Sequence, residues 1–200
     1  MTDVRPGAAV VMESRAGHVV DGSPSAAPIA HPALVLVIAS GLAVPAFATA
    51  PTTASGFLAA FLAAVLVVLA ASDLQRRIIP NRIVLPAAAI SLVANIAISP
   101  GRAPEFLLAA LGLGLVFLLP NVVNASLMGM GDVKLIMLLG ASLGWGAVGA
   151  IMIAFLSVFP FALVTLIRGG VAARKTTLPF GPFLALGGLV ICIVPHLIGG

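Results

Sequence analysis

Long apolar runs separated by short polar segments fill the chain from residue 31 onward. The first two runs cover about Pro32–Ala50 and Gly56–Ser72, and the second of them ends on Asp73. After a short basic segment, a third run covers about Ile83–Ser99. A helix needs roughly 17–25 apolar residues to cross the hydrocarbon core of a bilayer. We therefore predict a transmembrane helix at each of these three runs.

The second half of the chain continues this pattern, with a fourth run at about Phe106–Leu119 that ends at residues 120–121 (Pro-Asn). The segment Val133–Arg168 is harder to assign, because it is too long for one span and short for two. We predict two helices with a turn at Gly144-Trp145-Gly146, since tryptophan is typical of the membrane interface. A last run covers about Phe180–Ile198. The pattern predicts an all-α, polytopic transmembrane bundle of seven spans, or six if Val133–Arg168 is a single span.

Composition supports a membrane protein: 61% of the residues are hydrophobic and only 8% are charged, against about 25% charged in ordinary soluble domains. The net charge of +4 does not indicate a nucleic-acid partner, because the basic residues are scattered between the apolar runs. Residues 1–30 are polar and lack apolar periodicity, so we predict a flexible cytoplasmic N-terminal tail rather than a secretory signal. Residues 31–200 then form one membrane-embedded domain.

The basic residues also predict the orientation, because cytoplasmic loops are enriched in lysine and arginine. If the segment after Asp73 is cytoplasmic, one basic residue, Arg102, lies outside, and nine lie inside: Arg5, Arg15, Arg76, Arg77, Arg82, Lys134, Arg168, Arg174 and Lys175. A single span across Val133–Arg168 would move the last three of these outside, which is why we favour two. The N-terminus is then cytoplasmic and the C-terminus lies outside.

This topology brings two acidic residues to the same side of the membrane. Of the six acidic residues, three are in the tail and Glu105 is in an outer loop. The remaining two, Asp73 and Asp132, both lie at cytoplasmic ends of spans, although only lysines and arginines were used to set the topology. Because a charged side chain costs roughly 2.5–3.5 kcal/mol at mid-bilayer, such acids are candidates for a functional site.

Two carboxylates at similar depth are suited to the activation of water. Close together in a low dielectric they do not both ionise easily, so one stays protonated while the other is charged. The charged one takes a proton from water as it attacks a carbonyl, and the protonated one hydrogen-bonds that carbonyl and later protonates the leaving amine. This is the chemistry of an aspartic protease. Three other interpretations stay open: Asp132 as a helix N-cap, the pair as relay sites of a proton- or cation-coupled transporter, and a structural membrane partner that needs neither.

The residues around Asp132 fit a peptide site. Gly129 and Gly131 lack a Cβ, so they permit a close approach of substrate backbone and a positive φ, or they form a turn before a helix. Lys134 reaches the interface or tunes the nearby charge. No metal site is expected, because two carboxylates without a nearby His or Cys make a poor ligand set.

Three segments together resemble the prepilin peptidases, the type IV leader peptidases that are GxGD membrane aspartic proteases. They are Asp73 with Ile79-Pro80-Asn81, then Gly129-Met130-Gly131-Asp132-Val133-Lys134, then Pro179–Ala185. The resemblance runs from about Ala70 to the C-terminus and implies that Asp73 and Asp132 are the catalytic pair. It also implies site-shaping roles for Pro80 and Asn81, which turn the chain into the third span, and for Pro179 and Gly181, which otherwise simply start the last helix.

The resemblance further implies an activity: removal of the basic leader from type IV prepilins or pseudopilins at the cytoplasmic face of a bacterial or archaeal inner membrane. The partners expected are the prepilin substrate and membrane lipid, without a cofactor. Larger members of the family carry paired Cys-x-x-Cys motifs and N-methylate the product. This chain has a single cysteine, Cys192, and resembles the short peptidase-only forms of tight-adherence (Flp) pili, so we expect no methyltransferase activity and no S-adenosylmethionine binding. A presenilin-like enzyme fits less well, because the chain has no tyrosine and lacks a Pro-Ala-Leu motif.

Overall fold

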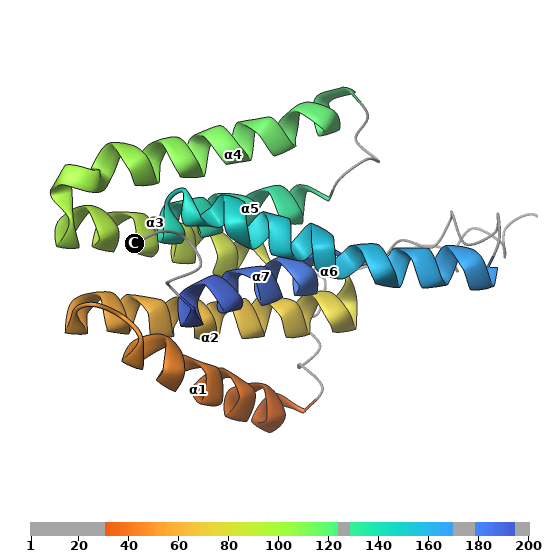
Figure 1. The fold of residues 1–200 in the computed structure, drawn as a ribbon, viewed down its shortest axis with the longest axis horizontal. Helices are drawn as coiled ribbons and strands as arrows, with labels where there is room; N and C mark the ends of the chain where they lie inside the picture. Colours follow the sequence, from red (N-terminus) through yellow and green to blue (C-terminus); the bar gives the residue numbers. More distant parts are fainter. Residues whose placement is uncertain (1–30, 124–128, 170–178, 195–200) are drawn as a thin grey trace, which may run out of the picture.

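The computed structural model describes residues 31–123, 129–169 and 179–194 (Figure 1). These ranges contain seven α-helices, one short 3₁₀ helix and no strand, which confirms the predicted all-α fold. The helices are α1 (Pro32–Ala48), α2 (Thr53–Arg76), α3 (Asn81–Ile98), η2 (Pro100–Arg102), α4 (Ala103–Val123), α5 (Met130–Leu143), α6 (Gly146–Gly169) and α7 (Gly181–Ile193). The predicted tail, residues 1–30, lies outside the described residues.

The helices run back and forth between two ends of an elongated bundle (Figure 1). Helix α2 ends, and α3, α5 and α7 begin, at the right-hand end in this view, which we call the aspartate end. The α1–α2 turn, η2 and the α5–α6 turn lie at the other end, which we call the opposite end. Within the described ranges, α2, α3, α4 and α6 are long and apolar enough to cross a membrane, while α1 and α7 are shorter apolar helices. The chain is therefore a polytopic membrane protein.

Helix α5 forms the centre of the bundle, where it contacts α3, α4, α6 and α7. Four of its side chains are completely buried: Leu135, Ile136, Leu138 and Leu139. Small residues permit the close packing that is typical of membrane helices. A Cβ on Gly140, for example, would lie 2.7 Å from the backbone of Ala109 in α4. Because other helices surround α5, its 14 residues do not have to match the full thickness of the bilayer.

The predicted turn at Gly144-Trp145-Gly146 is confirmed, and Val133–Arg168 falls into two helices, α5 and α6. Three predicted helix ends were wrong. Helix α2 continues past Ser72 through Arg76, because neither glycine nor proline occurs among residues 73–76, and it ends at Arg77, which adopts a positive φ of 53°. Helix α4 continues through Pro120 to Val123, since a proline removes only one helical hydrogen bond and an apolar medium offers the backbone no better partner. Helix α7 ends at Ile193, before the predicted Ile198.

Candidate active site

Asp73 lies in the last turn of α2, at the aspartate end, and its side chain is only 6% exposed. Its Oδ2 atom accepts a hydrogen bond of 3.1 Å from the backbone N–H of Gly181. A buried carboxylate needs such a donor, because an unpartnered charge would lose its hydration without compensation. The start of α7 therefore holds one oxygen of Asp73 in a fixed position.

Gly181 can make this contact only because it has no side chain. A Cβ at this position would lie 2.6 Å from Oδ2 and 3.0 Å from Cγ of Asp73, closer than real Cβ contacts. Gly181 is the first residue of α7, directly after Phe180 at the N-cap, and Pro179 precedes both. The structure thus brings Gly181 to Asp73, and it leaves Pro179 half-buried just before the helix.

Asp132 lies in the first turn of α5 and is partly buried. The residue at the N-cap is Gly129, so the interpretation of Asp132 as an N-cap is wrong. A Cβ at Gly129 would lie 3.3 Å from Oδ2 of Asp132, so the glycine leaves room beside the carboxylate. The two acids from distant parts of the sequence therefore lie at the same end of the bundle, where α2 ends and α5 begins (Figure 1).

The segment between α2 and α3 lies against the start of α5. Lys134 donates a hydrogen bond of 2.8 Å from Nζ to Oδ1 of Asn81, the first residue of α3, and Pro80 is the N-cap of that helix. A Cβ on Gly131 would lie 2.9 Å from Cβ of Ile79. Sequence reasoning selected Lys134 and Asn81 separately, but the structure shows that they bind each other. It also shows that Gly131 faces Ile79 of its own chain.

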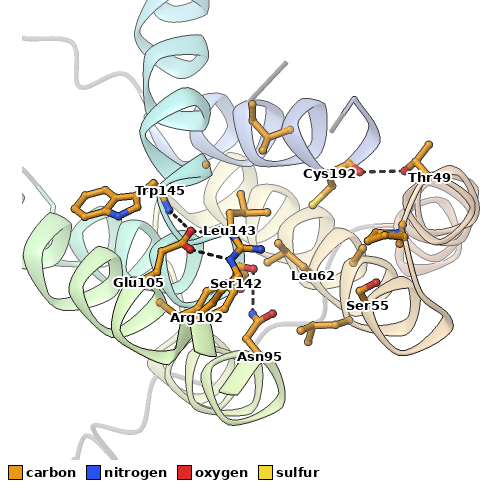
Figure 2. A pocket seen from close by; sticks show the side chains of 17 residues that line it. Thr49, Ser55, Leu62, Asn95, Arg102, Glu105, Ser142, Leu143, Trp145 and Cys192 are labelled. Atoms are coloured by element: carbon orange, nitrogen blue, oxygen red, sulfur yellow. Dashed lines mark hydrogen bonds and ion pairs between the residues drawn. The ribbon is translucent and has the colours of Figure 1, made fainter. Parts of the chain in front are cut away.

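A cavity of about 390 Å³ lies at the opposite end, away from both aspartates (Figure 2). Its lining includes Arg102 and Glu105, joined by two hydrogen bonds of 2.8 and 2.9 Å, and Trp145, whose backbone N–H reaches Glu105 at 3.4 Å. Asn95 crosses from α3 to the end of α5 in the same region, where it donates to the carbonyl of Ser142 at 3.1 Å. None of the catalytic or site-shaping residues predicted from the sequence lines this cavity.

Comparison with known proteins decides the family. Residues 60–167, which include both aspartates, match the type IV leader peptidase family. The chain belongs to this family. It is 36% identical over 141 residues to a prepilin leader peptidase/N-methyltransferase of Burkholderia pseudomallei, a match that covers 66% of this chain and 44% of that protein. It is 32% identical over 143 residues to a protein of the same name from Xanthomonas campestris pv. campestris, covering 68% of this chain and 49% of that one.

The chain spans about half the length of the curated relatives that it matches. No solved structure gives a significant match. Gly181, which holds Asp73, lies beyond the residues matched by the family, so this contact emerges from the fold alone. In the part of the chain that the structure describes, no three His, Cys, Asp or Glu side chains gather into a metal site, and metal-independent chemistry stays a prediction.

Proposed function

We propose that this chain is a membrane aspartic endopeptidase that removes the leader peptide from type IV prepilins or pseudopilins, with Asp73 and Asp132 as its catalytic pair. The single observation that carries the proposal is that the last turn of α2, which contains Asp73, and the first turn of α5, which contains Asp132, lie at the same end of the bundle (Figure 1). Membership of the leader peptidase family supplies the substrate class. Polytopic relay transporters also use intramembrane acids, but the family match does not favour that alternative.

The chemistry follows from two carboxyl groups that share one proton. The ionised carboxylate removes a proton from a water molecule as the water oxygen attacks the carbonyl carbon of the scissile peptide bond. The protonated carboxyl donates a hydrogen bond to the carbonyl oxygen. When the tetrahedral intermediate collapses, the C–N bond breaks and the leaving nitrogen receives a proton from the carboxyl pair, which leaves a new carboxylate and a free amine and returns the pair to its state with one shared proton. The N–H of Gly181 holds one Asp73 oxygen throughout.

We further propose that the aspartate end faces the cytoplasm of an inner membrane. The support is the distribution of Lys and Arg: Arg76, Arg77, Arg82 and Lys134 lie at the aspartate end and Arg102 at the opposite end. A membrane-impermeant thiol reagent tests this in intact cells in which Cys192 is replaced by serine. Gly101→Cys should react and Arg82→Cys should react only after lysis; the reverse pattern would refute the orientation.

The expected absence of N-methylation is a separate proposal. The curated relatives are named for both a peptidase and a methyltransferase, whereas the printed sequence of this chain contains one cysteine and therefore no Cys-x-x-Cys pair. The mature product should therefore carry an unmodified N-terminal amine. Its intact mass decides this, since a methylated product is heavier by one methyl group.

Co-expression with tagged prepilins tests the proposed activity. Each prepilin-like protein of the same organism is expressed with and without the wild-type chain, and processing is followed as a mobility shift on a gel. At least one should lose its basic leader, and the mass of the product should place the cut directly before its apolar segment. A transporter or a scaffold would give no shift with any candidate, and that result would overturn the proposal.

A further inference from the structure

Residues 78–81 (Ile-Ile-Pro-Asn), which comprise the end of the α2–α3 loop and the first residue of α3, touch the immediate neighbours of both aspartates, and we call this segment the loop strap. On the α2 side, the hydroxyl of Ser72 donates a hydrogen bond of 3.1 Å to the backbone carbonyl of Ile78. Ser72 is 8% exposed and directly precedes Asp73. This bond therefore ties the first residue of the loop strap to the turn that carries Asp73.

On the α5 side, two contacts join the loop strap to residues that flank Asp132. Ile79 is 7% exposed and packs so closely on Gly131 that a Cβ there would lie 2.9 Å away. Asn81 accepts the 2.8 Å hydrogen bond from Lys134. Gly131 directly precedes Asp132 and Lys134 lies two residues after it, so the loop strap contacts the chain on both sides of this carboxyl.

From these contacts we infer that the loop strap sets the separation of the two carboxyl groups, with Asn81 and Lys134 as a pair of positioning residues. This inference rests on the proposed function, since it assigns Lys134 a role in the same reaction. Lys134 acts through the Asn81 side chain, because the hydrogen bond between these two residues holds the loop strap against α5. The separation of the carboxyl groups affects the catalytic rate. A substitution far from the reacting atoms that misplaces a catalytic group by about 1 Å can lower the rate on the order of 100-fold.

The test compares variants of the full-length protein in detergent, with the prepilin that the wild-type chain cleaves best in co-expression as substrate. Asn81→Leu removes the acceptor, Lys134→Met removes the donor, and Asn81→Asp keeps an oxygen acceptor for the ammonium. We expect kcat to fall by about 10- to 100-fold in each of the first two, with little change in KM. Asn81→Asp should retain most of the wild-type kcat, and the Asn81→Leu/Lys134→Met double variant should be no slower than either single variant.

Asn95→Leu is the matched control, because Asn95 also joins α3 to α5 but does so at the opposite end. Its Nδ2 donates to the carbonyls of Ala141 and Ser142 at 3.0 and 3.1 Å. This variant should lower the thermal unfolding temperature without lowering kcat. A general loosening of the α3–α5 contact would instead reduce kcat in Asn95→Leu as well.

The possible results separate this inference from the proposed function. If the wild-type chain cleaves no prepilin, the proposed function fails first. If the wild-type chain cleaves and Asn81→Asp is as slow as Asn81→Leu, the hydrogen bond does not position the site. The inference is also overturned if kcat of the double variant falls by the product of the two single-variant decreases. Two residues that act through one hydrogen bond should not have independent effects, because either substitution alone removes that bond.

Discussion

Each end of the bundle holds an acidic side chain against a glycine, but the charge around the acid differs. At the opposite end, the Glu105 carboxylate lies against Gly144 and forms a two-point ion pair with Arg102 at 2.8 and 2.9 Å. At the aspartate end, Asp73 lies against Gly181, and a second acidic residue, Asp132, lies in the first turn of α5 at the same end (Figure 1). One end therefore joins unlike charges, and the other holds two acidic residues.

The difference separates a structural contact from the site that we propose to be reactive. A carboxylate in a two-point pair with a guanidinium is satisfied in charge and in hydrogen bonds, so it has little tendency to exchange a proton. Two neighbouring carboxyls hold a proton that either can release, which is the property that general acid–base catalysis needs. Proteins commonly lose some stability at such sites in exchange for activity. Similar side chains at the two ends are therefore expected to respond differently to substitution.

Among the substitutions outside the two aspartates, the largest loss of kcat is expected for Gly181→Ala. A Cβ here would lie 2.6 Å from Oδ2 of Asp73, so the carboxyl must move away from its backbone donor, and kcat should fall by about 100-fold. Gly188→Ala is the matched control in the same helix, because its Cβ meets the flexible ends of Leu66 and Leu139 instead. Kinetics on purified, folded protein check the difference. Equal kcat values for the two alanine variants would show that the contact with Asp73 does not matter.

Gly144→Ala is the counterpart of this substitution at the opposite end. Gly144 has a φ of 58° and its Cβ position is occupied by the Glu105 carboxylate. Alanine in such a conformation costs about 1–3 kcal/mol, so the unfolding temperature should fall while kcat of the folded fraction is retained. Thermal unfolding and active-fraction kinetics on the same sample measure both quantities. A loss of kcat without a loss of stability would mean that the two ends are not functionally distinct.

Gly131→Ala should have an intermediate effect. Its Cβ would approach Cβ of Ile79 to 2.9 Å, and a Cβ atom cannot rotate away because it is bonded directly to the backbone, so the loop strap must shift. We expect kcat to fall by about 10-fold, as measured by cleavage of the preferred prepilin. Gly101→Ala, which has open space around its Cβ position, should behave as the wild type. No change in Gly131→Ala would show that this contact tolerates movement.

The smallest effect is expected for Glu105→Gln. The side chains of Arg102 and Glu105 are 61% and 24% exposed, and exposed ion pairs contribute about 1 kcal/mol or less to the free energy of unfolding. The unfolding temperature should drop slightly at low salt, and high salt should reduce the difference from the wild type. Cleavage should be unaffected. A large loss of cleavage would assign the opposite end a part in the reaction.

Much of the fold could be predicted because apolar runs and their breaks are local properties. The turn at Gly144-Trp145-Gly146 followed from length and from two glycines around a tryptophan, and it is confirmed. The errors arose where a local rule competes with the surroundings. Pro120 was predicted to end a helix, yet α4 continues to Val123, because the cost of an unpaired backbone group in an apolar medium exceeds the cost of one proline.

The candidate site could be predicted only in part. Asp73 and Asp132 were selected because charge is rare in the chain, and positive-inside reasoning placed them at one end of the bundle. The partners of these residues depend on tertiary packing. Nothing local indicates that Gly181 donates to Asp73 across 108 positions of sequence. The Lys134–Asn81 bond likewise joins two residues that sequence motifs had selected independently.

The central claim is that Asp73 and Asp132 act as one catalytic unit. The most direct measurement compares cleavage rates of the preferred prepilin by the purified wild type, Asp73→Asn, Asp132→Asn and the double variant, each shown to be folded. Because residues that act as a unit are strongly non-additive, each single variant should lose nearly all cleavage and the double variant should be no slower than either single variant. A single variant that retains substantial cleavage, or a further loss in the double variant, would contradict the account.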